Sequence, residues 1–170
     1  DVSENLESLY NRLEDWPRLA AVLLRRDDHL ADDVDARIAN LSELARVHET
    51  RMGARDAAFF IWAKAAQIQP ADDLVAAELW RLAQDLGWWT EYVDHLAEVS
   101  ARMPEEMRQD HLLRFGEVLW RRAERPQQAI GWYEKVRAEW PENGVALGAL
   151  NGLYRGVGRW EGLLGVLCAQ

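Results

Sequence analysis

The sequence predicts an all-α chain of about ten antiparallel helices, in which consecutive helical hairpins stack on one another as a solenoid. Three observations support this fold class. Segments of the chain repeat at a fixed offset, apolar residues recur at three- and four-residue spacing, and no long stretch alternates apolar and polar residues as a strand would. Because each unit of a solenoid buries its apolar face on the next, such repetition predicts the architecture directly.

The repetition is clearest between residues 58–70, AFFIWAKAAQIQP, and residues 129–141, AIGWYEKVRAEWP, which lie 71 positions apart. Ala, Lys and Pro coincide in this comparison. At the same offset, the turn residues of two other hairpins coincide: Leu82, Gly87 and Trp89 with Leu153, Gly158 and Trp160. A third copy, with Leu9, Leu13 and Trp16, matches Leu82, Leu86 and Trp89 at an offset of 73. Three independent features therefore indicate a period of two hairpins.

The first two hairpins are expected over residues 3–28 and 32–69. Helix 3–13 ends at Glu14-Asp15, where a turn glycine would be typical, and helix 16–28 has Pro17 in its first turn, where a missing N–H costs little. Helix 32–51 begins with two aspartates, which suit the positive end of a helix dipole, and carries an apolar stripe through Leu44. Gly53 marks the next turn, and helix 55–69 stops before Pro70.

The remaining three hairpins are expected over residues 71–102, 105–140 and 143–169. Helix 71–86 again begins with two aspartates and ends at Gly87, and helix 89–102 ends before Pro104. Helix 105–123 begins with two glutamates and repeats the apolar stripe of helix 32–51; helix 126–140 has Pro126 in its first turn and stops before Pro141. Helices 143–157 and 159–169 meet at Gly158. All five hairpins are expected to form one domain, residues 1–170.

Composition excludes several classes of protein. With 49% hydrophobic and 29% charged residues the chain is of ordinary globular type, and its net charge of −9 argues against a nucleic-acid or anionic-membrane surface. One cysteine, Cys168, excludes an intrachain disulfide and a Cys-rich zinc site. No apolar run approaches the roughly 20 residues of a membrane-spanning helix. Localisation stays open, with the cytoplasm favoured.

Two segments of the chain resemble the tetratricopeptide repeat, a helical hairpin whose second helix follows A-x3-F-x2-A and a closing Pro. They carry Ala58, Trp62, Ala65 and Pro70, and Ala129, Tyr133, Val136 and Pro141. Leu44-Ala45 and Phe115-Gly116 stand where the family has Leu-Gly, and each of these first helices runs one residue longer than the standard unit. The whole chain is similar to the double repeats of about 70 residues in long bacterial tetratricopeptide-like proteins.

This resemblance implies a right-handed superhelix in which the first helix of each hairpin lines a concave groove. It also implies a non-enzymatic scaffold that binds a protein or an extended peptide there. The groove residues expected from this geometry are Arg12, Arg46, Glu49, Arg81, Gln84, Glu117, Trp120, Arg121 and Arg155. One arginine recurs in every first helix, so these arginines would form a ladder for carboxylates, with Trp120 as an aromatic anchor. The alternative is that the arginines only solvate an exposed face or pair with nearby glutamates.

No catalytic, cofactor or metal site is predicted. The four histidines lie on different helices or at their ends without an HExxH pattern, and no GxSxG motif occurs. The glycines at 156, 158 and 162 are spaced as GxGxxxG, and helices flank them on both sides, whereas a dinucleotide loop follows a strand. We therefore expect the chain not to be an enzyme.

Two other functions stay open. The last expected helix carries Trp160, Leu163, Leu164, Val166 and Leu167 and then stops, so the chain is expected to be a piece of a longer array or to self-associate through this apolar helix as a homo-oligomer. The chain also begins with Asp1 instead of Met. An RNA-processing helical repeat is the second alternative, which the acidic balance disfavours.

Overall fold

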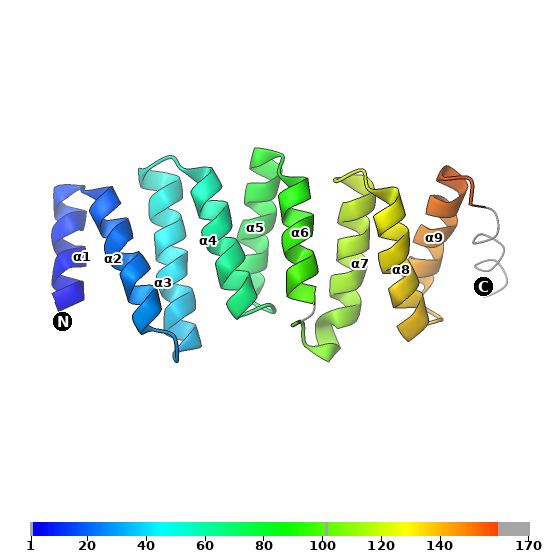
Figure 1. Cartoon of the computed structure of the whole chain (residues 1–170), viewed down its shortest axis with the longest axis horizontal. Coiled ribbons are helices and arrows are strands. Elements are labelled where there is room, and N and C mark those ends of the chain that lie inside the picture. The colour runs from blue at the N-terminus through cyan, green and yellow to red at the C-terminus, as the bar shows by residue number, and fades with distance from the viewer. Residues whose placement is uncertain (1, 101, 160–170) are drawn as a thin grey trace. The chain divides into compact units, whose positions relative to one another are not determined.

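The computed structural model describes residues 2–100 and 102–159, and every regular element in that part of the chain is helical (Figure 1). The elements are α1 (Val2–Leu13), α2 (Trp16–His29), α3 (Val34–Arg46), the π-helical turn η1 (Val47–Arg51), α4 (Arg55–Ile68), α5 (Asp73–Leu86), α6 (Trp89–Ser100), α7 (Glu105–Arg121), α8 (Pro126–Glu139) and α9 (Gly144–Gly156). The predicted all-α class is therefore confirmed. The predicted helix 159–169, with its apolar face and Cys168, lies outside the described residues apart from Arg159.

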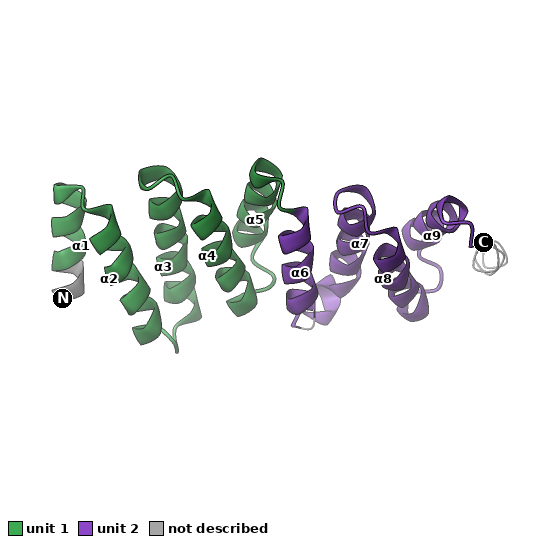
Figure 2. Ribbon diagram, turned by 45° about the horizontal axis from the view of Figure 1, so that its top comes forward, with its two compact units in different colours: residues 1–88 green, residues 89–170 purple. Residues whose placement is uncertain are grey.

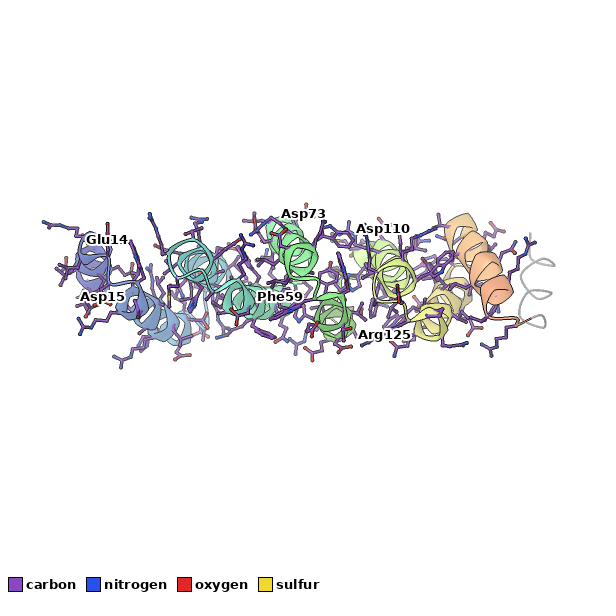
Figure 3. The ribbon with its side chains drawn as sticks, turned by 90° about the horizontal axis from the view of Figure 1, so that it is seen from above. Glu14, Asp15, Phe59, Asp73, Asp110 and Arg125 are labelled. Carbon is purple, nitrogen blue, oxygen red and sulfur yellow. The ribbon has the colours of Figure 1, made fainter. Side chains whose placement is uncertain are left out.

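The chain divides into two compact units, residues 1–88 and 89–170 (Figure 2). Within each unit every helix runs antiparallel to the next and packs against it. Seen along the helices, α1, α3 and α5 of the first unit form one row, and α2 and α4 form a second row (Figure 3). In the second unit α7 and α9 form one row, with α6 and α8 in the other. First and second helices of the hairpins thus form separate layers in each unit.

Short polar side chains determine where the first helices α3, α5 and α9 begin. The carboxylates of Asp33 and Asp72 accept the backbone N–H three residues on, each at 3.0 Å, and Asn143 does the same before α9 at 2.9 Å. This satisfies one of the N–H groups that a helix start leaves without a partner. Because the capping residue itself is not helical, α3 and α5 start two residues later than predicted. Pro17 and Pro126 lie in first helical turns, as predicted.

The hairpin turns are of two alternating types. A residue with a left-handed backbone conformation follows each first helix, namely Glu14, Gly53, Gly87, Glu124 and Gly158, with φ between 53° and 70°. After α1, α5 and α9 the next N–H reaches back five residues, as in Asp15 N to Tyr10 O at 3.0 Å. After η1 and α7 the N–H that follows the left-handed residue donates to a carbonyl six residues earlier: Ala54 N to His48 O and Arg125 N to Leu119 O, both at 2.8 Å. The extra residue predicted in alternate hairpins is accommodated in these longer turns.

A buried carboxylate joins three helices of the first unit. Asp27 of α2 is fully buried and accepts hydrogen bonds from Arg37 Nε of α3 at 2.8 Å and from Lys64 Nζ of α4 at 2.6 Å. Burial by itself raises the pKa of Asp27, but the hydrogen bonds and charges of Arg37 and Lys64 outweigh it and leave this pKa below its ordinary value. The ion triad therefore stabilises the packing of α2, α3 and α4 when Asp27 is ionised.

An equivalent polar contact joins a second helix to the following first helix in both units. Asn40 Nδ2 donates to Leu23 O at 2.9 Å, and His111 Nε2, 71 residues on, lies 3.4 Å from Leu96 O. The Ser100 hydroxyl donates to this same Leu96 carbonyl at 2.7 Å, so its oxygen accepts from His111 Nε2 at 2.9 Å. These bonds place the proton of a neutral His111 on Nε2. One copy of the contact thus uses an amide and the other a titratable imidazole.

Candidate binding groove

A groove lies between the two first helices of the second unit, α7 and α9. It has a volume of about 480 Å³, and a residue of α8 forms its floor. The lining residues are Leu113, Arg114, Glu117, Trp120, Arg121, Tyr133, Gly144, Val145, Gly148 and Ala149. All of them belong to residues 89–170, so the groove is contained in one compact unit.

Tyr133 of α8 forms the floor because α7 lets its ring come close. A Cβ atom at Gly116 would lie 2.8 Å from Tyr133 Cζ, well inside van der Waals contact, so only glycine permits this approach. The Tyr133 side chain is almost fully buried. Burial, and next the charge of Glu117, raise the pKa of Tyr133 to about 12, against the opposing charge of Arg121. The floor is therefore neutral at pH 7.

The α7 wall presents charged and aromatic side chains to solvent. Arg121 lies over the Trp120 ring at 4.5 Å from its centroid, and its Nε is 3.8 Å from Glu117. The Arg121 and Glu117 side chains are 61% and 65% exposed, so this pair is solvated and contributes little to stability. Arg114 makes no hydrogen bond or ion pair with any residue that the structure describes. The wall thus combines an aromatic surface, one loose ion pair and one unpaired cation.

The α9 wall is built largely from backbone. Glycine occurs at every fourth position of this helix, at 144, 148, 152 and 156, so one face carries no side chains. A Cβ atom at Gly152 would lie 3.0 Å from Trp120 Cη2, whereas one at Gly148 would meet nothing within 4 Å. Trp120 therefore touches α9 at Gly152, and the groove lies open beside Gly148. Tyr154, on the buried side of α9, donates a short hydrogen bond to Glu134 of α8.

In the first unit an ion pair occupies the place of the contact between Trp120 and Gly152. The residues 71 positions earlier are Glu49 and Arg81. Arg81 donates from both terminal nitrogens to the Glu49 carboxylate, at 2.8 and 2.7 Å, and also to Glu78 at 2.6 Å. The hydrogen bonds that Glu49 accepts from Arg81 lower the pKa of Glu49 and raise the pKa of Arg81. Two equivalent helix contacts are therefore made by opposite charges in one unit and by a tryptophan over a glycine in the other.

The predicted groove residues have different surroundings. Arg12, Arg46 and Gln84 of the first unit and Arg155 of α9 are exposed. Glu49 and Arg81 bind each other, so Arg81 is already occupied by acidic partners. Glu117, Trp120 and Arg121 are brought together in the groove of the second unit. As ligand-binding residues, all nine stay predictions.

Several lining residues were not among the predicted site residues. Arg114 was overlooked because one arginine per first helix was expected, and Tyr133 because it was assigned to the core. The glycine wall had a visible signal in the sequence, the four-residue spacing of Gly144, Gly148, Gly152 and Gly156. Such spacing leaves one helix face without side chains, which marks a place of close approach.

Two other features, a metal site and a membrane-spanning helix, are not found in the residues that the structure describes. Across the described part of the chain, His, Cys, Asp and Glu side chains do not gather in groups of three, as a bound metal ion would need. Within residues 2–100 and 102–159 each helix is too short or too polar to cross a lipid bilayer.

Comparisons with known proteins identify the fold. No protein-family model and no curated protein matches the sequence. The crystal structure of MamA aligns with 96% of this chain and 91% of that chain, with 16% sequence identity and a TM-score of 0.50. A crystal structure of Podosopora anserina putative kinesin light chain nearly identical TPR-like repeats aligns with 99% and 91%, with 18% identity and a TM-score of 0.46. The fold is thus a tetratricopeptide-like array of helical hairpins, as predicted.

Proposed function

We propose that this tetratricopeptide-like chain is a protein-interaction module that binds an extended segment of another protein in the groove between α7 and α9. The observation that carries the proposal is the groove itself. One wall offers Trp120 with charged neighbours, and the other offers bare backbone at Gly144 and Gly148 beside the small apolar side chains of Val145 and Ala149. Aromatic side chains in concave sites are the residues that most often dominate binding energy.

The dimensions of the groove suit a short extended peptide. Its α7 wall runs from Leu113 to Arg121, which is about 12 Å of helix at 1.5 Å per residue. An extended chain of about four residues covers the same length at roughly 3.3 Å per residue. The bare face of α9 lets the peptide backbone lie close to the helix, because no side chain projects at Gly148. Binding therefore needs no displacement of the residues that form the core.

Blocking the groove tests this proposal. Gly148→Gln places a side chain in the groove, and a Cβ atom at Gly148 meets nothing within 4 Å, so the fold is expected to tolerate it. Gly131→Gln is the matched control, since Gly131 is also a helical glycine with open space around it and lies on α8 outside the groove. Peptides selected from a random library against the whole chain are titrated into the protein and its variants.

We expect the selected peptides to bind the wild-type and Gly131→Gln proteins alike. Gly148→Gln and Trp120→Ala are expected to weaken binding by about tenfold or more, since losing a central aromatic contact costs on the order of 2 kcal/mol. Phe60→Ala, which removes an exposed aromatic ring from α4 outside the groove, serves as the control for Trp120→Ala. Unchanged affinity in both groove variants, or a library that yields no binder, would refute the proposal.

A further inference from the structure

The groove of the second unit carries a local charge opposite to that of the chain. Among its lining residues are two arginines, Arg114 and Arg121, and one acid, Glu117. The chain as a whole has a net charge of −9. Because Glu117 lies beside Arg121, the lining charge that has no ion-pair partner among the described residues is Arg114. The first turn of α9, at Gly144 and Val145, adds the positive end of a helix dipole to the same groove.

The equivalent positions of the first unit are acidic. The positions 71 residues before the lining residues are their equivalents in the first unit. The charged residues at these positions are Glu43, Arg46, Glu49, Asp73 and Glu78. With Arg81, the equivalent of Gly152 and the partner of Glu49 and Glu78, this surface has four acids and two bases, where the second unit has one acid and two bases. The buried hydrophobic positions of the two units, by contrast, coincide: Leu82 and Leu153, for example, are both buried. The two units thus share buried positions, whereas this face has an excess of acidic residues in the first unit and of basic residues in the second.

We propose that the groove between α7 and α9 selects an acidic extended segment, with two carboxylate side chains flanking an apolar one. This inference rests on the proposed function and names the chemistry of its ligand. The carboxylates would be bound by Arg114 and by Arg121, and the apolar side chain would contact Val145, which is 65% exposed, and Trp120. The acidic face of the first unit repels the same segment, so binding is confined to the second unit.

The separation of the two arginines favours side-chain carboxylates over the single carboxylate of a chain terminus. Arg114 and Arg121 are seven residues apart on α7, which places their backbones about 10 Å apart along the helix at 1.5 Å per residue. Acidic side chains two to four residues apart in an extended peptide are separated by roughly 7 to 13 Å. A single terminal carboxylate supplies one negative charge, so it leaves one of the two guanidinium groups without a counter-charge.

Peptides with blocked ends test this directly. The probe is an acetylated and amidated octapeptide with two glutamates three residues apart, a leucine between them and alanine or serine elsewhere. Its counterparts replace both glutamates by glutamine or by lysine, and a fourth peptide carries the two glutamines with a free C-terminal carboxylate. Each is titrated into the ¹⁵N-labelled chain, and the amide signals of Gly144, Gly148 and Gly152 report binding in the groove.

We expect the glutamate peptide to bind most tightly and to shift the groove glycines. The glutamine peptide should bind about two- to fivefold more weakly for each exposed ion pair lost, and the lysine peptide more weakly still. Raising the salt from about 0.1 M to about 1 M, which shortens the screening length from about 10 Å to about 3 Å, should remove the preference. Arg114→Glu, which installs the residue type of the equivalent Glu43, should abolish it, whereas Arg108→Gln on the same helix outside the groove should not.

The outcomes separate the two proposals. Glutamine and glutamate peptides that shift the groove glycines with equal affinity would overturn the acidic preference and leave the peptide-binding function standing. Tightest binding by the lysine peptide, or by the glutamine peptide with a free carboxylate, would also overturn it. If no peptide shifts these glycine signals, both proposals fail.

Discussion

The contact between Gly116 and Tyr133 predicts that a substitution normally favourable in a helix is unfavourable here. Alanine is preferred over glycine in a helix interior by about 1 kcal/mol, so Gly116→Ala would stabilise α7 if nothing opposed it. The added Cβ atom, however, would lie 2.8 to 3.0 Å from three ring atoms of Tyr133. Because Tyr133 is only 3% exposed, its ring has little room to move away.

The balance of these two effects gives the expected magnitude. Forcing an extra methyl group into a packed core costs about 1 to 3 kcal/mol, which exceeds the gain in helix propensity. We expect Gly116→Ala to lower the free energy of unfolding by about 1 kcal/mol, the net of these values. Since Tyr133 forms the floor of the groove, the same substitution should also weaken any ligand bound there.

Urea denaturation, followed by circular dichroism, measures this effect. Gly131→Ala is the control, because Gly131 lies in the neighbouring helix with no atom near its missing Cβ. That variant should be about 1 kcal/mol more stable than the wild type. In a Tyr133→Leu background, Gly116→Ala should regain its stabilising sign. The reasoning would be refuted if Gly116→Ala stabilised the wild-type protein as much as Gly131→Ala does.

Two further predictions concern buried ionisable groups. Asp27→Asn should lower the free energy of unfolding at pH 7 by about 2 to 3 kcal/mol. This is less than the usual cost of breaking a buried ion pair, because the cationic partners Arg37 and Lys64 stay partly exposed. The control Asp28→Asn should change the free energy of unfolding by less than about 0.5 kcal/mol. Since the pKa of Asp27 is lowered in the folded protein, the difference in stability between the Asp27→Asn and Asp28→Asn variants is present above pH 3.8 and is lost as the pH falls further. Equal stabilities of the two variants at pH 7 would contradict this prediction. Desolvation lowers the pKa values of His95 and His111, so the unfolded chain takes up protons first and stability should fall as the pH drops below 6.5. His111→Asn should reduce that pH dependence, and denaturation curves that keep the same dependence would count against the assignment.

The fold was largely predictable because its signals are periodic. The offset of 71 residues aligned the buried Ala58 with Ala129, and both are fully buried in the structure. Helices and turns are determined by residues close together in the chain, so periodic apolar spacing and turn glycines in one sequence are enough to predict them. The starts of α3 and α5 were missed by two residues, since each begins near two adjacent aspartates and only the structure shows which one is the cap: Asp33, the second of its pair, and Asp72, the first of its pair. Glu124 in a left-handed turn was not predictable, because glutamate has no preference for that conformation.

The candidate groove was predictable only in part, because it depends on which side chains meet across helices. Glu117, Trp120 and Arg121 were predicted to line a groove from the resemblance to the tetratricopeptide repeat. Whether Arg81 is available to a ligand could not be predicted, since its partner Glu49 lies 32 residues away in sequence. The role of Gly116 depends likewise on the distance to Tyr133, which only the packing of α7 against α8 determines.

The glycines of α9 also determine how this helix holds its shape. Gly148 and Gly152 each make an isolated helix about 1 kcal/mol less stable than alanine would, whereas Ala77 and Arg81 of α5, at the equivalent positions, are both good helix formers. The order of α9 therefore comes from its contacts with α8, such as the bond between Tyr154 and Glu134, more than from its own sequence. The α9 wall of the groove is thus only as stiff as its contacts with neighbouring helices make it.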